Sequence, residues 1–356
     1  MSERIVKRNA TSDVLTTTDS LLRATGLTAA YTVDGGEVVA VDDVSIDMRR
    51  GEVLGVAGES GCGKSTLGAV LSLTLRPPLF VRSGELEVDG RRLDLGPHQK
   101  PPRSWRGEVV SLLPQGAMNS LSPTVRIRDF AYDVIRAHQS GVRRDDAIER
   151  TRQRLEHLDL PRRVLDYYPH QLSGGMKQRV VTVISTLLNP RLLIADEPTS
   201  ALDVSSQRVL IEMLKEMLSE EIIGGVIFIT HDLPVLNIVA DRIAIMYAGQ
   251  IAEVGTARDI INQPRHPYSA ALLSSVLVPE PAMRRTRVQG IPGAPPSLMH
   301  PPGGCRFHPR CGLVMDVCRD QAPPKVGDER RFASCWWAEQ NPGQNPSQNP
   351  SRAREV

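Results

Sequence analysis

The 356-residue sequence lacks any apolar run that approaches the roughly 18 to 20 residues of a membrane-spanning helix. It also lacks an excess of one charge, because 43 Lys and Arg residues against 41 Asp and Glu residues leave a net charge of only +2. Residues 1–20 are polar and have no apolar core like that of a signal peptide. We therefore expect a cytoplasmic chain that has no surface built for nucleic acid or acidic lipid and reaches a membrane only through a partner.

The length exceeds that of most single domains, so we expect one large domain with an appendage. Residues 1–20 are predicted to form a flexible tail, and residues 21–265 the main domain. Beyond Pro264 the sequence becomes rich in proline, which marks residues 266–340 as a C-terminal extension. Residues 341–356 repeat Asn, Pro and Gln and are predicted to be disordered.

Cysteine is scarce, and four of the five cysteines fall in the extension. In a reducing compartment such a cluster favours a metal site over disulfides. The four are Cys305, Cys311, Cys318 and Cys335, separated by five, six and sixteen residues. These intervals lack the paired Cys-x-x-Cys of a zinc ribbon, and four thiolates suit either Zn²⁺ or an iron–sulfur cluster.

Apolar strands alternate with amphipathic helices along the main domain. This alternation predicts an α/β fold with a parallel sheet that is covered by helices on both faces. The predicted strands include Val53–Ala57, Leu192–Ala195 and Val226–Thr230, and helices are predicted at Gly174–Leu188 and Ser205–Leu218.

Two further helical stretches are predicted from apolar spacing. One follows Gly63, includes Leu75 and ends at the proline pair 77–78. The other occupies residues 125–172, where Asp145 or Asp146 is the candidate N-cap of a helix.

A phosphate-binding loop is predicted directly after the first apolar strand. Residues 58–66 read Gly-Glu-Ser-Gly-Cys-Gly-Lys-Ser-Thr and fit the pattern G-x-x-x-x-G-K-[S/T]. Glycines let the backbone N–H groups turn toward a phosphate, and the following helix adds its positive end. Lys64 can reach the β- and γ-phosphates of ATP, and Ser65 can bind Mg²⁺. The candidate nucleotide-binding residues are Gly58, Ser60, Gly61, Gly63, Lys64, Ser65 and Thr66.

Two acids end the apolar strand at residues 192–195. The carboxyl ends of parallel strands face the ligand crevice, so these acids are expected to lie beside the phosphate-binding loop. We expect Asp196 to hold Mg²⁺ through water and Glu197 to act as the general base that orients the attacking water.

A third motif narrows the class of nucleotide-binding protein. Residues 172–179 read Leu-Ser-Gly-Gly-Met-Lys-Gln-Arg and lie just upstream of the acid strand. Ser173, Gly174 and Gly175 open a helix and so offer a hydroxyl and unpaired N–H groups to an anion. The motif resembles the signature of ABC ATPases. That resemblance implies that this helix end covers the γ-phosphate bound by an opposite subunit, so that catalysis requires a dimer.

Single residues extend the resemblance. Tyr31 resembles the aromatic residue that stacks on adenine, although simple packing remains an alternative. Gln115 resembles the glutamine that contacts γ-phosphate and Mg²⁺. Asp203, in a loop that resembles the one communicating across the dimer, also has the sequence context of a plain helix cap. His231 resembles the switch histidine, with a structural histidine as the alternative.

The family resemblance also implies the architecture. A P-loop NTPase (RecA-like) core is expected, together with an antiparallel β-subdomain and a helical subdomain at about residues 116–172. Two residues depart from the commonest family pattern. Met176 stands where many relatives have Gln, and Gly116 stands where an acid often follows the sensing glutamine. The second departure bears on the expected contact with the transmembrane partner.

The extension resembles the C-terminal region of oligopeptide and dipeptide importer ATPases. The likeness rests on residues 266–273 (His-Pro-Tyr-Ser-Ala-Ala-Leu-Leu), on Gly290–Gly293 and on Cys305–Cys311. Relatives of this type imply a [4Fe–4S] cluster on the four cysteines, which we favour over Zn²⁺ and over metal-free thiols. A staple of this kind would hold a segment that has little core of its own.

The resemblance implies an ATPase that powers import of peptides or a related solute such as oligosaccharide, at the cytoplasmic face of the membrane. The implied partners are a second ATPase subunit, two permease subunits and, indirectly, a solute-binding protein. A heterodimer is preferred, although both ATP-binding motifs look intact and allow a homodimer. Two alternatives are weighed: a soluble ABC ATPase acting on ribosomes or DNA, and a P-loop kinase. An ATPase of the first kind is expected to have a second nucleotide-binding domain or long coiled-coil arms, which this sequence does not show. The kinase interpretation leaves the signature at residues 172–179 unexplained.

Overall fold

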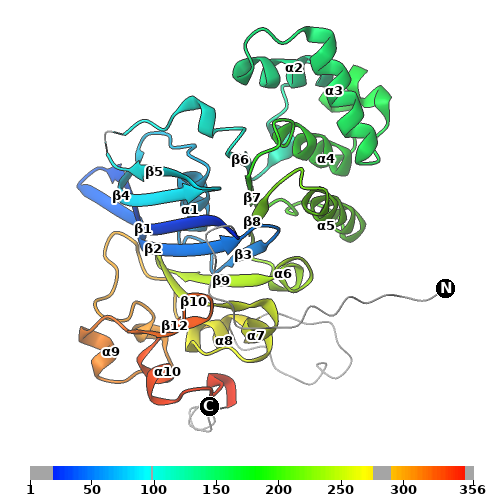
Figure 1. The fold of residues 1–356 in the computed structure, drawn as a ribbon. Coiled ribbons are helices and arrows are strands. Elements are labelled where there is room, and N and C mark those ends of the chain that lie inside the picture. The colour runs from blue at the N-terminus through cyan, green and yellow to red at the C-terminus, as the bar shows by residue number, and fades with distance from the viewer. Residues whose placement is uncertain (1–18, 98, 276–289, 349–356) are drawn as a thin grey trace, which may run out of the picture.

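The computed structural model describes residues 19–97, 99–275 and 290–348, and its centre is one large mixed sheet (Figure 1). The order of strands in this sheet, within the described residues, is β11-β12-β10-β9-β3-β8-β7-β6. Neighbours from β9 to β6 are parallel, whereas β10, β11 and β12 are antiparallel additions at one edge. The parallel strands are β3 (Val53–Ala57), β6 (Val110–Leu113), β7 (Leu192–Asp196), β8 (Gly225–Ile229) and β9 (Arg242–Tyr247). The predicted α/β class and parallel sheet are therefore confirmed.

The central strands are buried on both faces, because alternate side chains enter two different cores. Ile194, Ile227 and Ile229 pack with helix α1 (Lys64–Leu71) on one face. Phe228 and Leu193 point to the other face, where they join α5 (Val204–Ser219) and α6 (Leu233–Val239). An unbroken apolar run therefore forms a strand here, since neither face of the sheet meets water.

A second sheet is antiparallel and lies against the same core as α1. Its strand order is β2-β1-β4-β5. It corresponds to the β-subdomain that the family resemblance implies, and Figure 1 shows it beside α1. The four strands are β1 (Ser20–Val33), β2 (Gly36–Arg49), β4 (Leu79–Val88) and β5 (Arg91–Leu95).

The region after β6 is helical and stands apart from the β-subdomain (Figure 1). It contains α2 (Ile127–His138), α3 (Arg144–His157) and α4 (Gly174–Ser185). The N-cap of α3 is Arg143, so the prediction of Asp145 or Asp146 as cap is wrong. Both acids lie in the first turn instead, where a carboxylate is favoured by the positive end of the helix.

Helix α1 is shorter than the apolar spacing predicts. It ends at Leu71, with Ser72 as C-cap, so Leu75 lies beyond the helix. Leu73 has φ +57°, a left-handed conformation that ends an α-helix whatever the apolar pattern that follows.

The extension joins the central sheet, which the sequence pattern does not indicate. β12 (Phe332–Ser334) pairs with β10 (Gln250–Thr256), and β11 (Lys325–Gly327) pairs with β12. The remaining helices are α7 (Ala257–Asn262), α8 (Pro267–Ser274), α9 (Val317–Asp320) and α10 (Trp336–Gln340). None of the helices in the described ranges is both long and apolar enough to cross a membrane.

The two predicted tails lie largely outside the described residues. Positions 1–18 and 349–356 are not described, and β1 begins at Ser20. The structure differs from the prediction at residues 341–348, which include a short 3₁₀ turn at Pro346–Gln348. Pro346 is buried and Asn345 donates a hydrogen bond to the carbonyl of Asn262, so packing holds this stretch despite its composition.

Candidate functional site

A cavity of about 600 Å³ lies at the carboxyl ends of β3, β7 and β8. In a parallel sheet this is the edge at which ligands bind. Most of the predicted nucleotide-binding residues line it. The lining comprises Tyr31, Val38, Ala40, Ser60, Gly61, Gly63, Lys64, Ser65, Thr66, Gln115, Glu197, Ser200, His231 and Leu298.

The phosphate-binding loop can take its path only with glycine at two positions. Gly58 has φ +154° and Gly63 has φ +105°. A Cβ atom would lie 2.2 Å from the carbonyl oxygen of Met246 at the first position and 2.1 Å from that of Ala40 at the second. The loop leads directly into α1, whose first N–H groups have no partner within the helix and so can bind an anion.

The Lys64 ammonium is held inside the loop. Its Nζ donates to the carbonyl oxygens of Gly58 at 2.8 Å and Glu59 at 2.9 Å, and the residue is only 8% exposed. A bound phosphate offers the stronger, charged acceptor for the same donor. Cys62, next to this lysine in space, is buried, and that burial raises the pKa of its thiol.

Ser65 and Asp196 come together from α1 and β7. The Ser65 hydroxyl donates to Asp196 Oδ1 at 3.3 Å. Burial raises the pKa of Asp196, and the hydrogen bond from Ser65 opposes this shift. A hydroxyl and a carboxylate at one point are oxygen ligands of the kind that Mg²⁺ takes, and a bound cation would favour the charged carboxylate.

Glu197 and His231 also meet at this edge. His231 Nδ1 lies 2.8 Å from Glu197 Oε1, and the Thr230 hydroxyl is 3.4 Å from Glu197 Oε2. The Glu197 side chain is 11% exposed, whereas that of His231 is 72% exposed. Glu197 has φ +49°, a strained conformation for a residue other than glycine and one that clusters at functional sites. The pair can orient and deprotonate a water molecule.

Tyr31 and Gln115 line the same cavity from other elements. The Tyr31 hydroxyl lies 3.0 Å from Thr66 Oγ1 and fixes the ring beside the start of α1. Gln115 follows β6 and stands among the lining residues with Glu197. The structure thus brings both residues to the site that the sequence predicts.

The signature residues lie elsewhere in the chain's own structure. Ser173 is the N-cap of α4 and accepts a hydrogen bond from Met176 N at 3.3 Å. Ser173 and Gly174 are exposed, Gly175 is partly exposed, and none of the three lines the described cavity. This helix end is therefore free to meet another molecule.

Asp203 has the geometry of a helix cap. It is the N-cap of α5, and its carboxylate accepts from Ser206 N at 2.9 Å. That backbone hydrogen bond, with a second one from the Ser206 hydroxyl, lowers the pKa of Asp203. The hydrogen bonds from Ser206 thus support the alternative that Asp203 is a helix cap. A role of Asp203 across a dimer stays a prediction.

Sequence reasoning missed several residues that touch the site. Val38, Ala40 and Ser200 line the cavity, and so does Leu298, which comes from the extension. Tyr268 and Arg310, also from the extension, both contact Glu59 of the phosphate-binding loop. The two stand inside motifs at residues 266–273 and 305–311, but a motif does not say which distant loop its side chains contact.

The four cysteines of the extension lie near one another. Cys305, Cys318 and Cys335 are buried and Cys311 is partly buried. Burial raises the pKa of Cys305, and that of Cys335 to about 12, with smaller contributions from the neighbouring cysteines. Thiols are therefore favoured over thiolates unless a cation compensates their charge.

The spacing of the sulfur atoms tests which metal fits. Within the described residues, the group of three Cys, His or acidic ligand atoms that lie within 4.8 Å of one another is His157, Glu216 and Glu220, not any three cysteines. A Zn²⁺ ion with bonds of 2.3 Å needs sulfur atoms about 3.8 Å apart. No three of the four sulfur atoms therefore lie as close together as a zinc tetrahedron requires.

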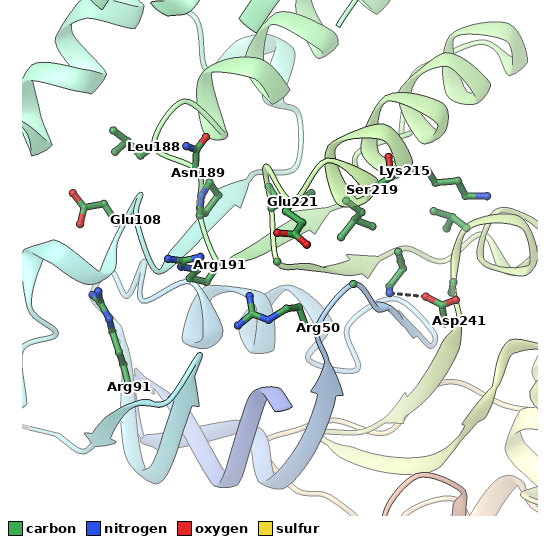
Figure 2. A pocket seen from close by; sticks show the side chains of 18 of the residues that line it. Arg50, Arg91, Glu108, Leu188, Asn189, Arg191, Lys215, Ser219, Glu221 and Asp241 are labelled. Atoms are coloured by element: carbon green, nitrogen blue, oxygen red, sulfur yellow. Dashed lines mark hydrogen bonds between the residues drawn. The ribbon is translucent and has the colours of Figure 1, made fainter. Parts of the chain in front are cut away.

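A second cavity, of about 980 Å³, lies at the opposite edge of the sheet, where the strands begin (Figure 2). Arg50, Arg191 and Lys215 line it together with Glu221 and Asp241. Some of its polar groups pair within the lining: Val53 N donates to Asp241 Oδ2 at 2.8 Å (Figure 2), and Lys215 Nζ donates to the Ile238 carbonyl at 2.9 Å. None of the predicted site residues, all of which fall within the described ranges, lines this cavity.

Comparisons with known proteins agree with the motifs. The ABC transporter family profile matches residues 41–200, and the profile of the oligopeptide/dipeptide transporter C-terminal region matches residues 252–318. The chain is 39% identical over 325 residues to the dipeptide transport ATP-binding protein DppD of Caldanaerobacter subterraneus, covering 90% of this chain and 98% of that protein. It is 40% identical to the oligopeptide transport ATP-binding protein OppD of Bacillus subtilis, over 89% of this chain and 88% of the relative.

The fold has solved counterparts as well. A bacterial ABC transporter cassette whose dimeric structure is known superposes with a TM-score of 0.57 at 23% sequence identity. The match covers 67% of this chain and 99% of the cassette, so it supports the fold of the cassette portion.

Proposed function

This chain belongs to the family of ATP-binding subunits of dipeptide and oligopeptide ABC transporters, and we propose that it powers the import of peptides or a related solute such as oligosaccharide. ABC transporter subunits of this kind hydrolyse ATP, and this chain is such an ATPase. One observation carries the proposal for the site: a phosphate-binding loop, a Ser–Asp pair and a Glu–His pair converge on one cavity. The alternative of a ribosome- or DNA-directed ATPase is not supported by the relatives.

The proposed chemistry is the in-line attack of water on the γ-phosphate, which breaks its bond to the β–γ bridging oxygen and releases ADP and inorganic phosphate. Lys64 and the loop amides hold the phosphates, while Ser65, Asp196 and Gln115 hold Mg²⁺. Glu197 takes the proton of the water, and His231 fixes the carboxylate and contacts the γ-phosphate. Tyr31 offers its ring to adenine, and the Thr66 hydroxyl, 3.0 Å from the Tyr31 hydroxyl, keeps that ring in place.

The site of one chain is incomplete on the proposed mechanism. Ser173, Gly174 and Gly175 are to cover the γ-phosphate bound by a second ATPase subunit, with Asp203 beside the dimer contact. Their exposure at the start of α4 supports this role. A heterodimer with a different ATPase is preferred, and a homodimer is the alternative.

The remaining partners are two permease subunits at the cytoplasmic face of the membrane and, indirectly, a solute-binding protein. The helical region around α2 and α3 is the proposed contact with the permeases. Gly116, which replaces the usual acid after Gln115, alters part of that contact.

We also propose that Cys305, Cys311, Cys318 and Cys335 hold a [4Fe–4S] cluster. Their burial and their proximity support it. The cluster would act as a structural staple for the extension. Anaerobic purification should give a brown protein with about four iron atoms per chain, as the four-thiolate ligand set of such a cluster requires. A colourless, iron-free protein would remove this proposal.

The transport function is tested by reconstitution. The chain is combined in liposomes with candidate permeases, a candidate solute-binding protein and a candidate second ATPase, and ATP hydrolysis is measured with and without peptide. Peptide-stimulated hydrolysis is expected, and it should vanish in the Lys64→Ala variant. Stimulation by oligosaccharide in place of peptide would reassign the cargo, and hydrolysis that survives Lys64→Ala would refute the site.

A further inference from the structure

One residue of the phosphate-binding loop, Glu59, is held from outside the cassette. The Arg310 guanidinium grips the Glu59 carboxylate with two bonds, Nη1 to Oε2 at 2.6 Å and Nη2 to Oε1 at 3.0 Å. The Tyr268 hydroxyl accepts a hydrogen bond from the backbone N–H of Glu59 at 2.8 Å. The carbonyl of Glu59 accepts from Lys64, so all three polar groups of this residue are occupied.

Tyr268 and Arg310 belong to the extension, and contacts with the extension and with Tyr247 of β9 hold them in place. Arg310 is 8% exposed, and it also donates to the Pro292 carbonyl at 2.8 Å and to the Tyr247 hydroxyl at 3.2 Å. Tyr268 is fully buried. The rings of Tyr247, Tyr268 and Phe307 pack against one another, with centroids 4.5 to 5.2 Å apart.

The contacts fix both the path and the charge of the loop. Because the Glu59 N–H is directed at Tyr268, the loop starts from a defined orientation before its later amides turn toward phosphate. The Glu59 carboxylate is a negative charge on the loop that must bind a polyphosphate. A bidentate Arg offsets that charge and fixes the orientation of the Glu59 carboxylate more tightly than a lysine would.

We propose that Arg310 and Tyr268 are positioning residues of the ATP site, through which the C-terminal extension sets the geometry and the electrostatic potential of the phosphate-binding loop. Arg310 neutralises Glu59, and Tyr268 orients its peptide group. The extension is thus part of the nucleotide site. This inference rests on the proposed ATP-binding function of the loop.

The two residues act differently, which separates a positioning role from a merely structural one. Without Arg310, the uncompensated Glu59 charge repels the phosphates, so the defect should depend on salt and should disappear when Glu59 is neutral. Without the Tyr268 hydroxyl, the backbone N–H of Glu59 loses its acceptor. That defect should depend neither on the salt concentration nor on the charge of Glu59.

The test is titration calorimetry of MgATP into the isolated full-length chain, with thermal unfolding of each variant as the check on folding. Arg310→Gln is expected to weaken MgATP binding about tenfold at low salt, and less at high salt. Glu59→Gln added to Arg310→Gln should restore the affinity to within about threefold of wild type, because no charge is left unpaired. Arg310→Lys, which keeps the charge and loses the fork, should lie between the two.

Arg306→Gln is the matched control. Arg306 leaves the same loop of the extension and docks onto Asp42 and the Ala248 carbonyl, not onto Glu59. It should change MgATP affinity by less than about twofold, since its partner carboxylate is outside the phosphate-binding loop.

Tyr268→Phe should weaken binding about fivefold at every salt concentration, and Glu59→Gln should not rescue it. It also tests the proposal if Arg310→Gln does not fold.

The outcomes separate this inference from the function on which it rests. A wild-type chain that binds no MgATP overturns the proposed function itself. Wild-type binding together with Arg310→Gln and Tyr268→Phe variants of unchanged affinity overturns only the positioning roles. A defect in Arg310→Gln that Glu59→Gln leaves uncorrected overturns the charge argument and leaves Arg310 a structural contact.

Discussion

The two edges of the central sheet both carry a cavity, and the smaller one is the candidate site. The cavity at the carboxyl edge measures about 600 Å³ and the one at the amino edge about 980 Å³. At the carboxyl edge α1 begins, so its positive end faces the cavity. At the amino edge α5 and α6 end, and Lys215 donates to the Ile238 carbonyl at the negative end of α6.

The difference follows from chain direction. In a parallel strand–helix–strand unit, each helix starts where its strand ends, so helix N-termini gather at one edge and C-termini at the other. Phosphate is favoured at the first edge and disfavoured at the second. Cavity size therefore does not locate the site in this molecule, and the direction of the strands does.

Substitution of one glutamate at each edge of the sheet is the strongest test of this comparison. Glu197→Gln at the carboxyl edge should lower kcat for ATP about 10²- to 10⁴-fold and leave MgATP affinity almost unchanged, because the general base is lost while the phosphate contacts remain. Glu221→Gln at the amino edge is the matched control, since Glu221 also has a left-handed backbone, with φ +56°. Steady-state ATP hydrolysis by the assembled transporter measures both. Fast turnover by Glu197→Gln would reject the base.

A second prediction uses the extension, whose Tyr268, Leu298 and Arg310 reach the carboxyl-edge site. His266 is buried, its Nδ1 accepts from Tyr268 N at 2.9 Å, and burial lowers its pKa from 6.5 to about 4. Above pH 6.5 the ring is neutral whether folded or unfolded. Between about pH 6.5 and 4 the unfolded chain takes up a proton on His266 and the folded chain does not. The free energy of unfolding should therefore decrease by about 3 kcal/mol as the pH is lowered through this range.

Unfolding free energy measured against pH checks this expectation. His266→Asn keeps an acceptor for Tyr268 N but cannot be protonated, so its stability should fall less over the same pH range. Equal pH dependence in the variant and the wild type would show that protonation of His266 does not cause the loss of stability.

A third prediction concerns metal binding at the carboxyl edge. Burial raises the pKa of Asp196 above the ordinary 3.8, although Ser65 opposes the shift. Protonation removes the Mg²⁺ ligand, so the Mg²⁺ concentration needed for half-maximal hydrolysis should rise as pH falls, at a higher pH than an ordinary Asp would require. Asp196→Asn should need more Mg²⁺ at every pH and lose this dependence. An Mg²⁺ requirement in the wild type that is independent of pH would contradict the assignment.

The smallest effect is expected at the amino edge. The double variant Arg191→Gln, Lys215→Gln should change MgATP affinity by less than about twofold, because these side chains balance local acids and helix ends far from the phosphates. Lys215 donates to the Ile238 carbonyl at 2.9 Å and Arg191 pairs with Asp89 at 3.2 Å, so modest loss of stability is expected instead. Calorimetry with MgATP and thermal unfolding separate the two effects. A large loss of affinity would move the phosphate site to this edge.

Much of this arrangement was predictable from short stretches of sequence. The loop at residues 58–66 requires glycine at fixed positions, and the apolar strand before Asp196 delivers its acids to the ligand edge, so Lys64, Ser65 and Glu197 could be assigned to one site. Each of these signals is local, because backbone conformation and strand direction depend on neighbouring residues. Two of the errors were local as well: α1 ends before the left-handed backbone of Leu73 despite the apolar pattern that follows, and α3 begins after Arg143 and not after an Asp.

What the tertiary structure decided is which distant segments meet. The sequence places Arg310 and Tyr268 in motifs, but 251 and 209 residues separate them from Glu59, and no periodicity links such positions. The pairing of β12 with β10 and the arrival of Leu298 at the nucleotide cavity have the same character. Contacts of this kind arise from the packing of whole elements, which a pattern of near neighbours does not encode.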